Sequence, residues 1–402
     1  MDVIVIGGGA AGMVAAIKAL NNGHKVTILE QKEKLGKKLL ATGNGRCNLT
    51  NRILAECPWE EYLFDAADYD KVKNIFKSFS YEDTIRFFDS LGLMVGYEGD
   101  YVYPLSKQAS SVYEVLTYKL RDLGADIKTD TYVTNISKEN DKFMIKASGN
   151  TFKADKVICA FGSKAMPKLG GADKGYYILN KLGHKMKDIA PGLVQLKCDD
   201  KMLKDLAGVR TDALLSLFDI KREVYKERGQ LQFTDYGLSG IVAMNLSNYL
   251  YNISNEAYVY VDLLADFEDK ELTEILIERK NSFKFRNTNE LLTGMLPNKV
   301  SYVILKKLNI DNKLINDLSD DEILNISSLI KHMKFKITGT NSYDDAQICM
   351  GGISLSEVNE CMESNHIKGL YIVGETLNVH GRCGGFNLQW AFTTGAIAGE
   401  LR

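Results

Sequence analysis

The start of the chain has two short apolar runs, separated by a glycine-rich turn and a segment whose apolar residues have helical spacing. Residues 3–6 form a continuous apolar run, as expected of a strand that is covered on both faces of a parallel sheet. Glycines occupy most of 7–12, apolar residues recur with helical spacing over 14–20, and a second strand signal at 25–29 ends at Glu30. This order predicts a βαβ unit.

The following segments predict an α/β arrangement. Residues 36–52 are polar, contain glycine and lack a period, so we expect an ordered loop there. Apolar positions recur with helical spacing over 70–93 and 109–123. Between 125 and 160, short alternating segments end in an apolar strand, which favours a β-meander that returns to the parallel sheet.

A different pattern begins near Pro191 and Gly192 and occupies the middle of the chain. Residues 193–265 have mostly strand signals with polar turns, whereas 269–333 have helical spacing. A strand signal at 334–338 then leads back to glycine-rich sequence. The pattern therefore predicts that the middle of the chain is an insert in the α/β unit.

Composition narrows the class of protein. Lys and Arg number 50 against 52 Asp and Glu, so no net field attracts nucleic acid or an anionic membrane. The seven cysteines are scattered and contain no CxxC, which argues against a disulfide framework, a metal site or a redox dithiol. No apolar run reaches the roughly 18 residues that span a bilayer. We expect a cytoplasmic protein with no membrane or nucleic-acid partner; its oligomeric state is open.

The turn after the first strand has the spacing GxGxxG. In this motif the first glycine permits the turn, the second lets the backbone approach a pyrophosphate, and the third lets the helix pack on the strand. The helix N-terminus stabilises phosphate charge, and Glu30 can accept hydrogen bonds from ribose hydroxyls. The spacing alone does not separate FAD from NAD. The predicted cradle consists of Gly7, Gly9, Ala10, Ala11, Gly12, Glu30 and Gln31.

A second glycine-rich segment near the C-terminus favours FAD. The apolar strand at 369–373 ends in Gly374 and Glu375, whose carboxylate can bind ribityl hydroxyls. A helix predicted from about Asn387 would place backbone N–H groups and a positive dipole near the flavin N1/O2 edge. The residues predicted to bind the cofactor here are Gly374, Glu375, Gly384, Gly385, Phe386, Asn387 and Leu388.

Longer blocks resemble one family along nearly the whole chain. They include GKKLLATGNGRCNLTN at 36–51, FTDYGLSG at 233–240 and FNLQWA at 386–391. These blocks resemble the signature of the HI0933-like flavoproteins, also called the BaiN-type NAD(P)/FAD-dependent oxidoreductases. The resemblance implies a Rossmann-like FAD-binding domain of the two-dinucleotide-binding-domain flavoprotein type. Its expected parts are 1–191, a β-barrel-like insert at 192–268, a helical-bundle insert at 269–333, a return strand at 334–345, and a second FAD part at 346–402.

The resemblance also implies further cofactor contacts. It places the loop at 43–48 close to the flavin, with Arg46 as a candidate to neutralise pyrophosphate or flavin charge. Val133 falls where related flavoproteins meet the adenine through backbone groups. Cys47 is more simply a small packed residue than a reactive thiol. The residues added to the predicted site are Lys38, Asn44, Gly45, Arg46, Cys47, Asn48, Val133 and Gly162.

Two residues are candidates for catalysis. His380 precedes the helix predicted to face the flavin, so it either donates a proton to the substrate or holds the loop. Tyr236, like Tyr101 and Tyr103, either lines an apolar substrate site or serves as an acid. The chain has no second GxGxxG, so NAD(P)H as co-substrate would have to dock transiently.

The leading hypothesis is an FAD-dependent oxidoreductase in which NAD(P)H reduces the flavin, which then passes hydride to an activated C=C bond. The resemblance implies a small-molecule enone substrate of the 3-oxo-steroid or bile-acid type. One alternative is a flavin-dependent amine or amino-acid oxidase that produces hydrogen peroxide. Another is a non-catalytic flavin-binding protein that acts in RNA modification or regulation.

Overall fold

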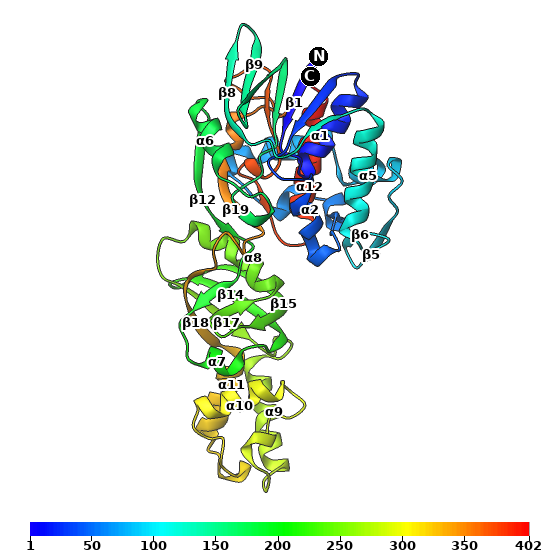
Figure 1. Cartoon of the computed structure of the whole chain (residues 1–402). Helices are drawn as coiled ribbons and strands as arrows, with labels where there is room; N and C mark the ends of the chain where they lie inside the picture. The colour runs from blue at the N-terminus through cyan, green and yellow to red at the C-terminus, as the bar shows by residue number, and fades with distance from the viewer. Residues whose placement is uncertain (402) are drawn as a thin grey trace. The chain divides into compact units, whose positions relative to one another are not determined.

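The apolar run at the N-terminus forms β1 (Asp2–Ile6), the middle strand of a five-stranded sheet in the computed structural model, which describes residues 1–401. The sheet order is β20-β11-β1-β2-β7, and each pair of neighbours is parallel. Figure 1 labels β1 of this sheet, beside α1. This sheet confirms the predicted Rossmann-like class. The other four strands are β2 (Lys25–Leu29), β7 (Asp126–Lys128), β11 (Lys156–Cys159) and β20 (Leu370–Ile372).

The described chain divides into two compact units. The first joins Met1–Pro191 to the chain from Ala346 onward, and the second is Gly192–Asp345. The parallel sheet belongs to the first unit, although β20 comes from the C-terminal segment. One sheet is therefore completed by two segments that the second unit separates in sequence.

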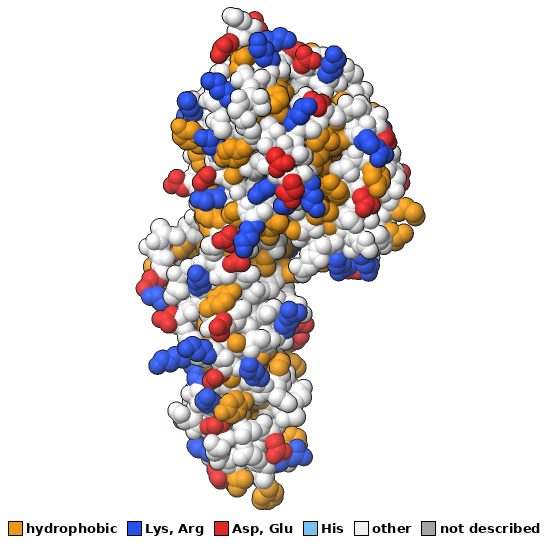
Figure 2. Space-filling model, viewed as in Figure 1, with side chains coloured by type: hydrophobic (Ala, Val, Ile, Leu, Met, Phe, Trp, Pro, Cys, Tyr) orange, Lys and Arg blue, Asp and Glu red, His pale blue; other side chains and the backbone are white. Residues whose placement is uncertain are grey.

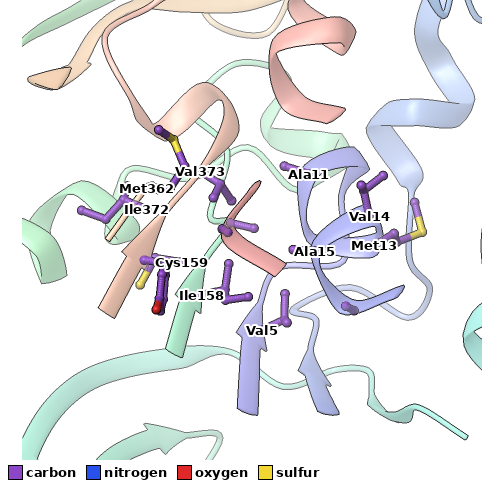
Figure 3. Packing of buried hydrophobic residues seen from close by; sticks show 14 of the residues in the cluster. Val5, Ala11, Met13, Val14, Ala15, Ile158, Cys159, Met362, Ile372 and Val373 are labelled. Atoms are coloured by element: carbon purple, nitrogen blue, oxygen red, sulfur yellow. The ribbon is translucent and has the colours of Figure 1, made fainter. Parts of the chain in front are cut away.

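Two helices from opposite ends of the chain pack closely on each other in the first unit: α1 (Ala10–Asn21) and α12 (Phe386–Gly399). A Cβ on Gly395 would lie 2.4 Å from the carbonyl oxygen of Ala11, so only glycine allows this approach. Side chains of α1, β1 and β11, such as Val14, Val5 and Ile158, are fully buried together (Figure 3). This packing fixes the glycine turn between β1 and α1.

The segments around the parallel sheet depart in two places from the predicted elements. The loop expected at 36–52 contains a short helix, α2 (Lys37–Ala41), and a strand, β3 (Thr50–Asn51). The helical stretch at 70–93 breaks into α3 (Tyr69–Ser78) and α4 (Tyr81–Ser90). The break lies at Ser80, whose hydroxyl accepts the N–H of Asp83 while the Asp83 carboxylate accepts the N–H of Ser80, a capping box that starts a new helix.

Smaller sheets and two further helices complete the first unit. The three-stranded sheet β3-β6-β5 pairs β3 with a hairpin, and β10-β9-β8 is the expected meander. β12 pairs with β19, and β21 pairs with β4. The remaining elements are β4 (Tyr62–Leu63), β5 (Val95–Glu98), β6 (Tyr101–Pro104), α5 (Ala109–Asp122), β8 (Val133–Glu139), β9 (Lys142–Ala147), β10 (Asn150–Ala154), α6 (Lys174–Lys181), β12 (Met186–Gly192), β19 (Ile348–Ile353) and β21 (His380–Gly381).

The second unit is a closed barrel with helices that share its core. The barrel order is β13-β16-β15-β14-β17-β18, so the last strand returns after the helices to close it. Its elements are β13 (Leu196–Cys198), α7 (Met202–Leu206), β14 (Arg210–Asp219), β15 (Arg222–Phe233), β16 (Gly237–Ser239), α8 (Ile241–Tyr249), β17 (Ala257–Asp262), α9 (Asp269–Ser282), α10 (Asn298–Lys307), α11 (Asp320–Lys331) and β18 (Met333–Thr340). Within residues 1–401, none of the helices has the length and apolar character needed to cross a membrane.

Candidate functional site

The three glycines of the first turn have different surroundings. Gly7 has a φ of 100°, and a Cβ there would lie 2.2 Å from the carbonyl oxygen of Ala160. A Cβ on Gly12 would lie 1.9 Å from the carbonyl oxygen of Gly7, so the helix approaches the strand only with glycine there. By contrast, a Cβ on Gly9 would meet no atom of the described chain within 4 Å. Gly7 and Gly12 thus serve packing, whereas Gly9 borders open space.

The N-terminus of α1 opens at this space. Gly9 is the N-cap and supplies no side-chain hydrogen bond, and the first turn of the helix carries no acidic residue. Ala10 and Ala11 begin the helix without any bulky or charged side chain. Backbone N–H groups and the positive end of the helix dipole favour an anion at such a terminus. The turn therefore fits a pyrophosphate.

Glu30 stands at the end of β2 beside the turn. Its Oε2 accepts the N–H of Gly8 and its Oε1 accepts the N–H of Lys32, both at 2.8 Å. Burial raises the pKa of the Glu30 carboxyl, and the backbone hydrogen bonds partly offset that rise. A carboxylate can accept about four hydrogen bonds, so Glu30 can hold the turn and still accept ribose hydroxyls.

A cavity in the first unit is lined by some of the residues predicted to bind the dinucleotide, but not by Ala10, Ala11 or Gly12. Those among its lining are Gly7, Gly9, Glu30, Gln31, Lys38, Val133 and Gly162. Gln31, two residues after β2, donates a hydrogen bond from Nε2 to the carbonyl oxygen of Gly170 at 2.5 Å, and both residues line the cavity. Phe161, Ser163 and Lys174 also line the cavity, although they were not among the residues predicted to bind the cofactor. Phe161 and Ser163 follow closely after β11, and this position in the sequence could have indicated that they belong to the site.

An ion pair connects this cavity to the C-terminal segment. Nζ of Lys38 lies 2.7 Å from Oε2 of Glu375. Oε1 of Glu375 accepts the hydroxyl of Ser163 at 2.6 Å and the N–H of Cys349 at 3.0 Å. Lys38 and Ser163 both line the cavity, so the carboxylate predicted to meet the ribityl chain stands at its border. Gly374 packs close to Ala11, since a Cβ on Gly374 would lie 3.1 Å from the Cβ of Ala11.

The loop at 43–48 has an unusual backbone. Asn44 and Cys47 have φ values of 54° and 55°, and Gly45 has a φ of 84°. Burial raises the pKa of the Cys47 thiol to about 12, so the thiol stays protonated at neutral pH and is a packed group. Within residues 1–401, Oδ1 of Asn48 is buried and lacks a hydrogen-bond partner. A buried amide oxygen of this kind can accept a hydrogen bond from a ligand.

Arg46 extends from the same loop toward the β5–β6 hairpin. Its Nη2 lies 2.7 Å from Oε1 of Glu98, and its guanidinium carbon lies 4.4 Å from the centre of the Tyr103 ring. Arg46 does not line the cavity that holds the glycine turn. The Arg46 side chain thus contacts the hairpin. The backbone of the loop at 43–48, rather than this side chain, is the part of the loop that can approach a flavin.

The N-terminus of α12 is held by its glycines and by Asn387. A Cβ on Gly385 would lie 2.7 Å from the backbone of Thr50, and the φ of Gly384 is 126°. Asn387 accepts the N–H of Gly381 and donates to the carbonyl oxygen of the same residue, both at 2.9 Å. Phe386 is buried and Leu388 partly buried in the core. These side chains fix the helix start, which therefore offers backbone groups to a ligand.

The two candidates for catalysis lie in different units. His380, in β21, is 2% exposed, and its Nε2 lies 3.0 Å from Oδ1 of Asn378. Burial lowers the pKa of His380 to about 4, so the imidazole is neutral at neutral pH. Tyr236 belongs to the second unit and is 39% exposed. Its hydroxyl oxygen accepts a hydrogen bond from Nδ2 of Asn341 at 3.1 Å. The structure does not bring these two residues together in the cavity of the first unit.

Glu30→Ala should weaken FAD retention. The variant loses the acceptor for ribose hydroxyls, and a hydrogen bond to a charged group contributes about 1.5–3 kcal/mol. The dissociation constant of FAD, measured by fluorescence titration of apoprotein, is expected to rise about tenfold or more. Glu33→Ala is the matched control, since Glu33 is exposed and pairs with Lys37. Equal affinity in Glu30→Ala and wild type would remove Glu30 from the site.

Comparisons with known proteins identify the family of this chain. The family model "HI0933-like protein Rossmann domain" matches residues 1–401. A 3-dehydro-bile acid delta(4,6)-reductase of Clostridium scindens is 39% identical over 405 aligned positions, which cover 98% of this chain and 97% of that protein. A ribosomal RNA dihydrouridine synthase of Haemophilus influenzae is 28% identical over 97% of this chain and 96% of that protein. The solved 3-ketosteroid delta1-dehydrogenase of Sterolibacterium denitrificans, 11% identical, shares the fold with a TM-score of 0.50 over 99% of this chain and 98% of that one.

Proposed function

The chain belongs to the HI0933-like Rossmann-domain family, and from this premise we propose that it is an FAD-dependent reductase of carbon–carbon double bonds conjugated to a carbonyl group. The cavity with the glycine turn, Glu30 and the Lys38–Glu375 pair at its border carries the cofactor half of the proposal. The relative at 39% identity supports the reaction, because its name describes reduction of double bonds in a 3-oxo steroid acid.

The residues of the first unit have distinct parts in this proposal. The N–H groups at the start of α1 bind the pyrophosphate, and Glu30 binds the ribose. Glu375, with Lys38 and Ser163 beside it, orients the ribityl chain through its hydroxyls. The N-terminus of α12 places positive charge where reduction builds negative charge. Bound FAD supplies the hydride, and NAD(P)H is the proposed source of its electrons.

Anaerobic stopped-flow absorbance tests both half-reactions. NADH or NADPH should bleach the flavin band, and a 3-oxo-4-ene steroid should restore it. Absence of bleaching by either nucleotide would refute the nicotinamide half. Absence of reoxidation by enones, together with peroxide formation from an amine or amino acid in air, would replace the reductase with an oxidase.

A second candidate is reduction of uridine in ribosomal RNA. The dihydrouridine synthases of Haemophilus influenzae and Escherichia coli, 28% and 26% identical, each match at least 97% of this chain. The uracil C5=C6 bond is conjugated to a carbonyl, so the chemistry is the same and only the substrate differs. Reoxidation of the reduced enzyme by unmodified ribosomal RNA, but not by the steroid, would select this candidate.

A further inference from the structure

The β5–β6 hairpin carries a charge arrangement that the cofactor site does not use. Oε1 of Glu98 forms an ion pair with Nη2 of Arg46 at 2.7 Å and a second ion pair with Nζ of Lys107. Two cations thus share one carboxylate, which leaves the group with net positive charge. The pair lowers the pKa of the Glu98 carboxyl to about 2, with Arg46 as the larger cause. An anion is therefore favoured at this place.

The same hairpin adjoins the predicted flavin-facing helix. A Cβ built on Gly384 would lie 3.0 Å from Cε1 of Tyr101, and Asn51 donates from Nδ2 to the carbonyl oxygen of Gly384 at 3.1 Å. Gly384 immediately precedes the N-cap of α12. The aromatic face of the hairpin thus begins next to the region where we place the flavin ring.

Apolar side chains around this face are unusually open to solvent. Tyr101 is 37% exposed, Leu105 58% and Met94 69%. In Figure 2, Lys and Arg side chains gather at the edge of the first unit where Figure 1 labels β5 and β6, with hydrophobic side chains beside them. A contiguous apolar surface with a charged rim is typical of a binding site.

We propose that this hairpin surface selects the substrate: Tyr101 receives the apolar ring system of an enone, and Arg46, which lies over the Tyr103 ring, binds a carboxylate of the same substrate together with Lys107. The inference rests on the proposed reductase function and specifies its substrate as an anionic one. Lys107 has a side chain that is 57% exposed, so it can exchange Glu98 for a substrate carboxylate without moving the fold. A flat apolar body lies on tyrosine faces at little cost in side-chain entropy.

Binding to the oxidised holoenzyme tests the inference without turnover. Calorimetric titration compares a 3-oxo-4-ene steroid that carries a side-chain carboxylate with its uncharged methyl ester. The wild type should bind the acid more tightly, by about fivefold, as expected for ion pairs that remain partly exposed. Lys107→Glu should reverse or abolish this preference. Glu98→Gln should increase it about threefold, since both cations lose their internal partner.

The opposite directions of the two variants separate recognition from structural damage. Lys142→Glu, which breaks the exposed pair of Lys142 with Asp155 elsewhere in the first unit, should keep the wild-type preference. Equal binding of acid and ester, no binding of either, or a shift in the same direction in both hairpin variants would overturn the inference. Preferential binding without reoxidation of reduced flavin would instead refute the reductase function and leave the anionic anchor in place.

Discussion

Gly9→Val is expected to give a folded protein that purifies without FAD. A Cβ on Gly9 meets no described atom within 4 Å, and its φ of −78° suits any residue, so the substitution should leave the fold intact. The added side chain would occupy the space into which the N-terminus of α1 opens. We expect FAD affinity to fall at least about a hundredfold, the loss of several hydrogen bonds to a charged group. The absorbance spectrum and a thermal melt of the purified protein measure both properties.

Gly12→Val provides the contrasting variant in the same turn. A Cβ there would lie 1.9 Å from the carbonyl oxygen of Gly7, so the helix must move away from the strand. We expect a loss of unfolding free energy of a few kcal/mol, typical of overpacking. A yellow, fully flavinated Gly9→Val would show that the pyrophosphate does not lie at this turn. A melting temperature as low as that of Gly12→Val would show that Gly9 serves packing too.

The turn was predictable because its parts are adjacent in sequence. β1, the glycines and α1 follow one another directly, and the fixed spacing to Glu30 results from one helix and one strand. Such local geometry depends on φ preferences and on periodicity, which the sequence displays. The expectation of a discontinuous FAD domain had a different basis: the family resemblance covers both ends of the chain. The family model over residues 1–401 confirms that resemblance.

The interaction partners of the site residues could not be predicted from the sequence. The sequence predicted Glu375 and Lys38 separately as site residues, but their ion pair joins positions 337 residues apart. Arg46 was expected to neutralise cofactor charge, and the structure pairs it with Glu98, 52 positions away. No periodic pattern encodes such a pair, since it is set by tertiary packing.

Short elements were missed for a related reason. β3 has two residues, and its partner β6 lies about 50 positions later in the chain, so neither produces a readable alternation. The sequence therefore did not predict the hairpin surface in which we place substrate selection. It predicted only Tyr101 and Tyr103, as individual residues that line a substrate site or serve as acids. The apolar spacing over 70–93 likewise continued through the break at Ser80, because both helices bury a face on the same core.

His380 is expected to make the stability of the first unit depend on pH. Its pKa is about 4 in the folded protein, whereas the ordinary pKa of an exposed histidine is 6.5. Below about pH 6.5 the unfolded chain therefore binds a proton that the folded chain refuses, and stability falls as the pH is lowered toward 4. At 1.36 kcal/mol for each pKa unit, about 2 kcal/mol should be lost between pH 7.5 and pH 5.

His380→Gln should remove that part of the pH dependence. Both tryptophans, Trp59 and Trp390, lie in the first unit, so their fluorescence during urea unfolding reports on this unit alone. The difference in unfolding free energy between pH 7.5 and pH 5 should be about 2 kcal/mol smaller in the variant, with FAD saturating in every sample. An unchanged pH dependence would show that His380 is not a buried neutral imidazole. If the pH dependence of unfolding stayed unchanged but kcat fell strongly and its pH profile changed, His380 would be the proton donor to the substrate. If the pH dependence of unfolding decreased and kcat was retained, His380 would be the residue that holds the loop before α12.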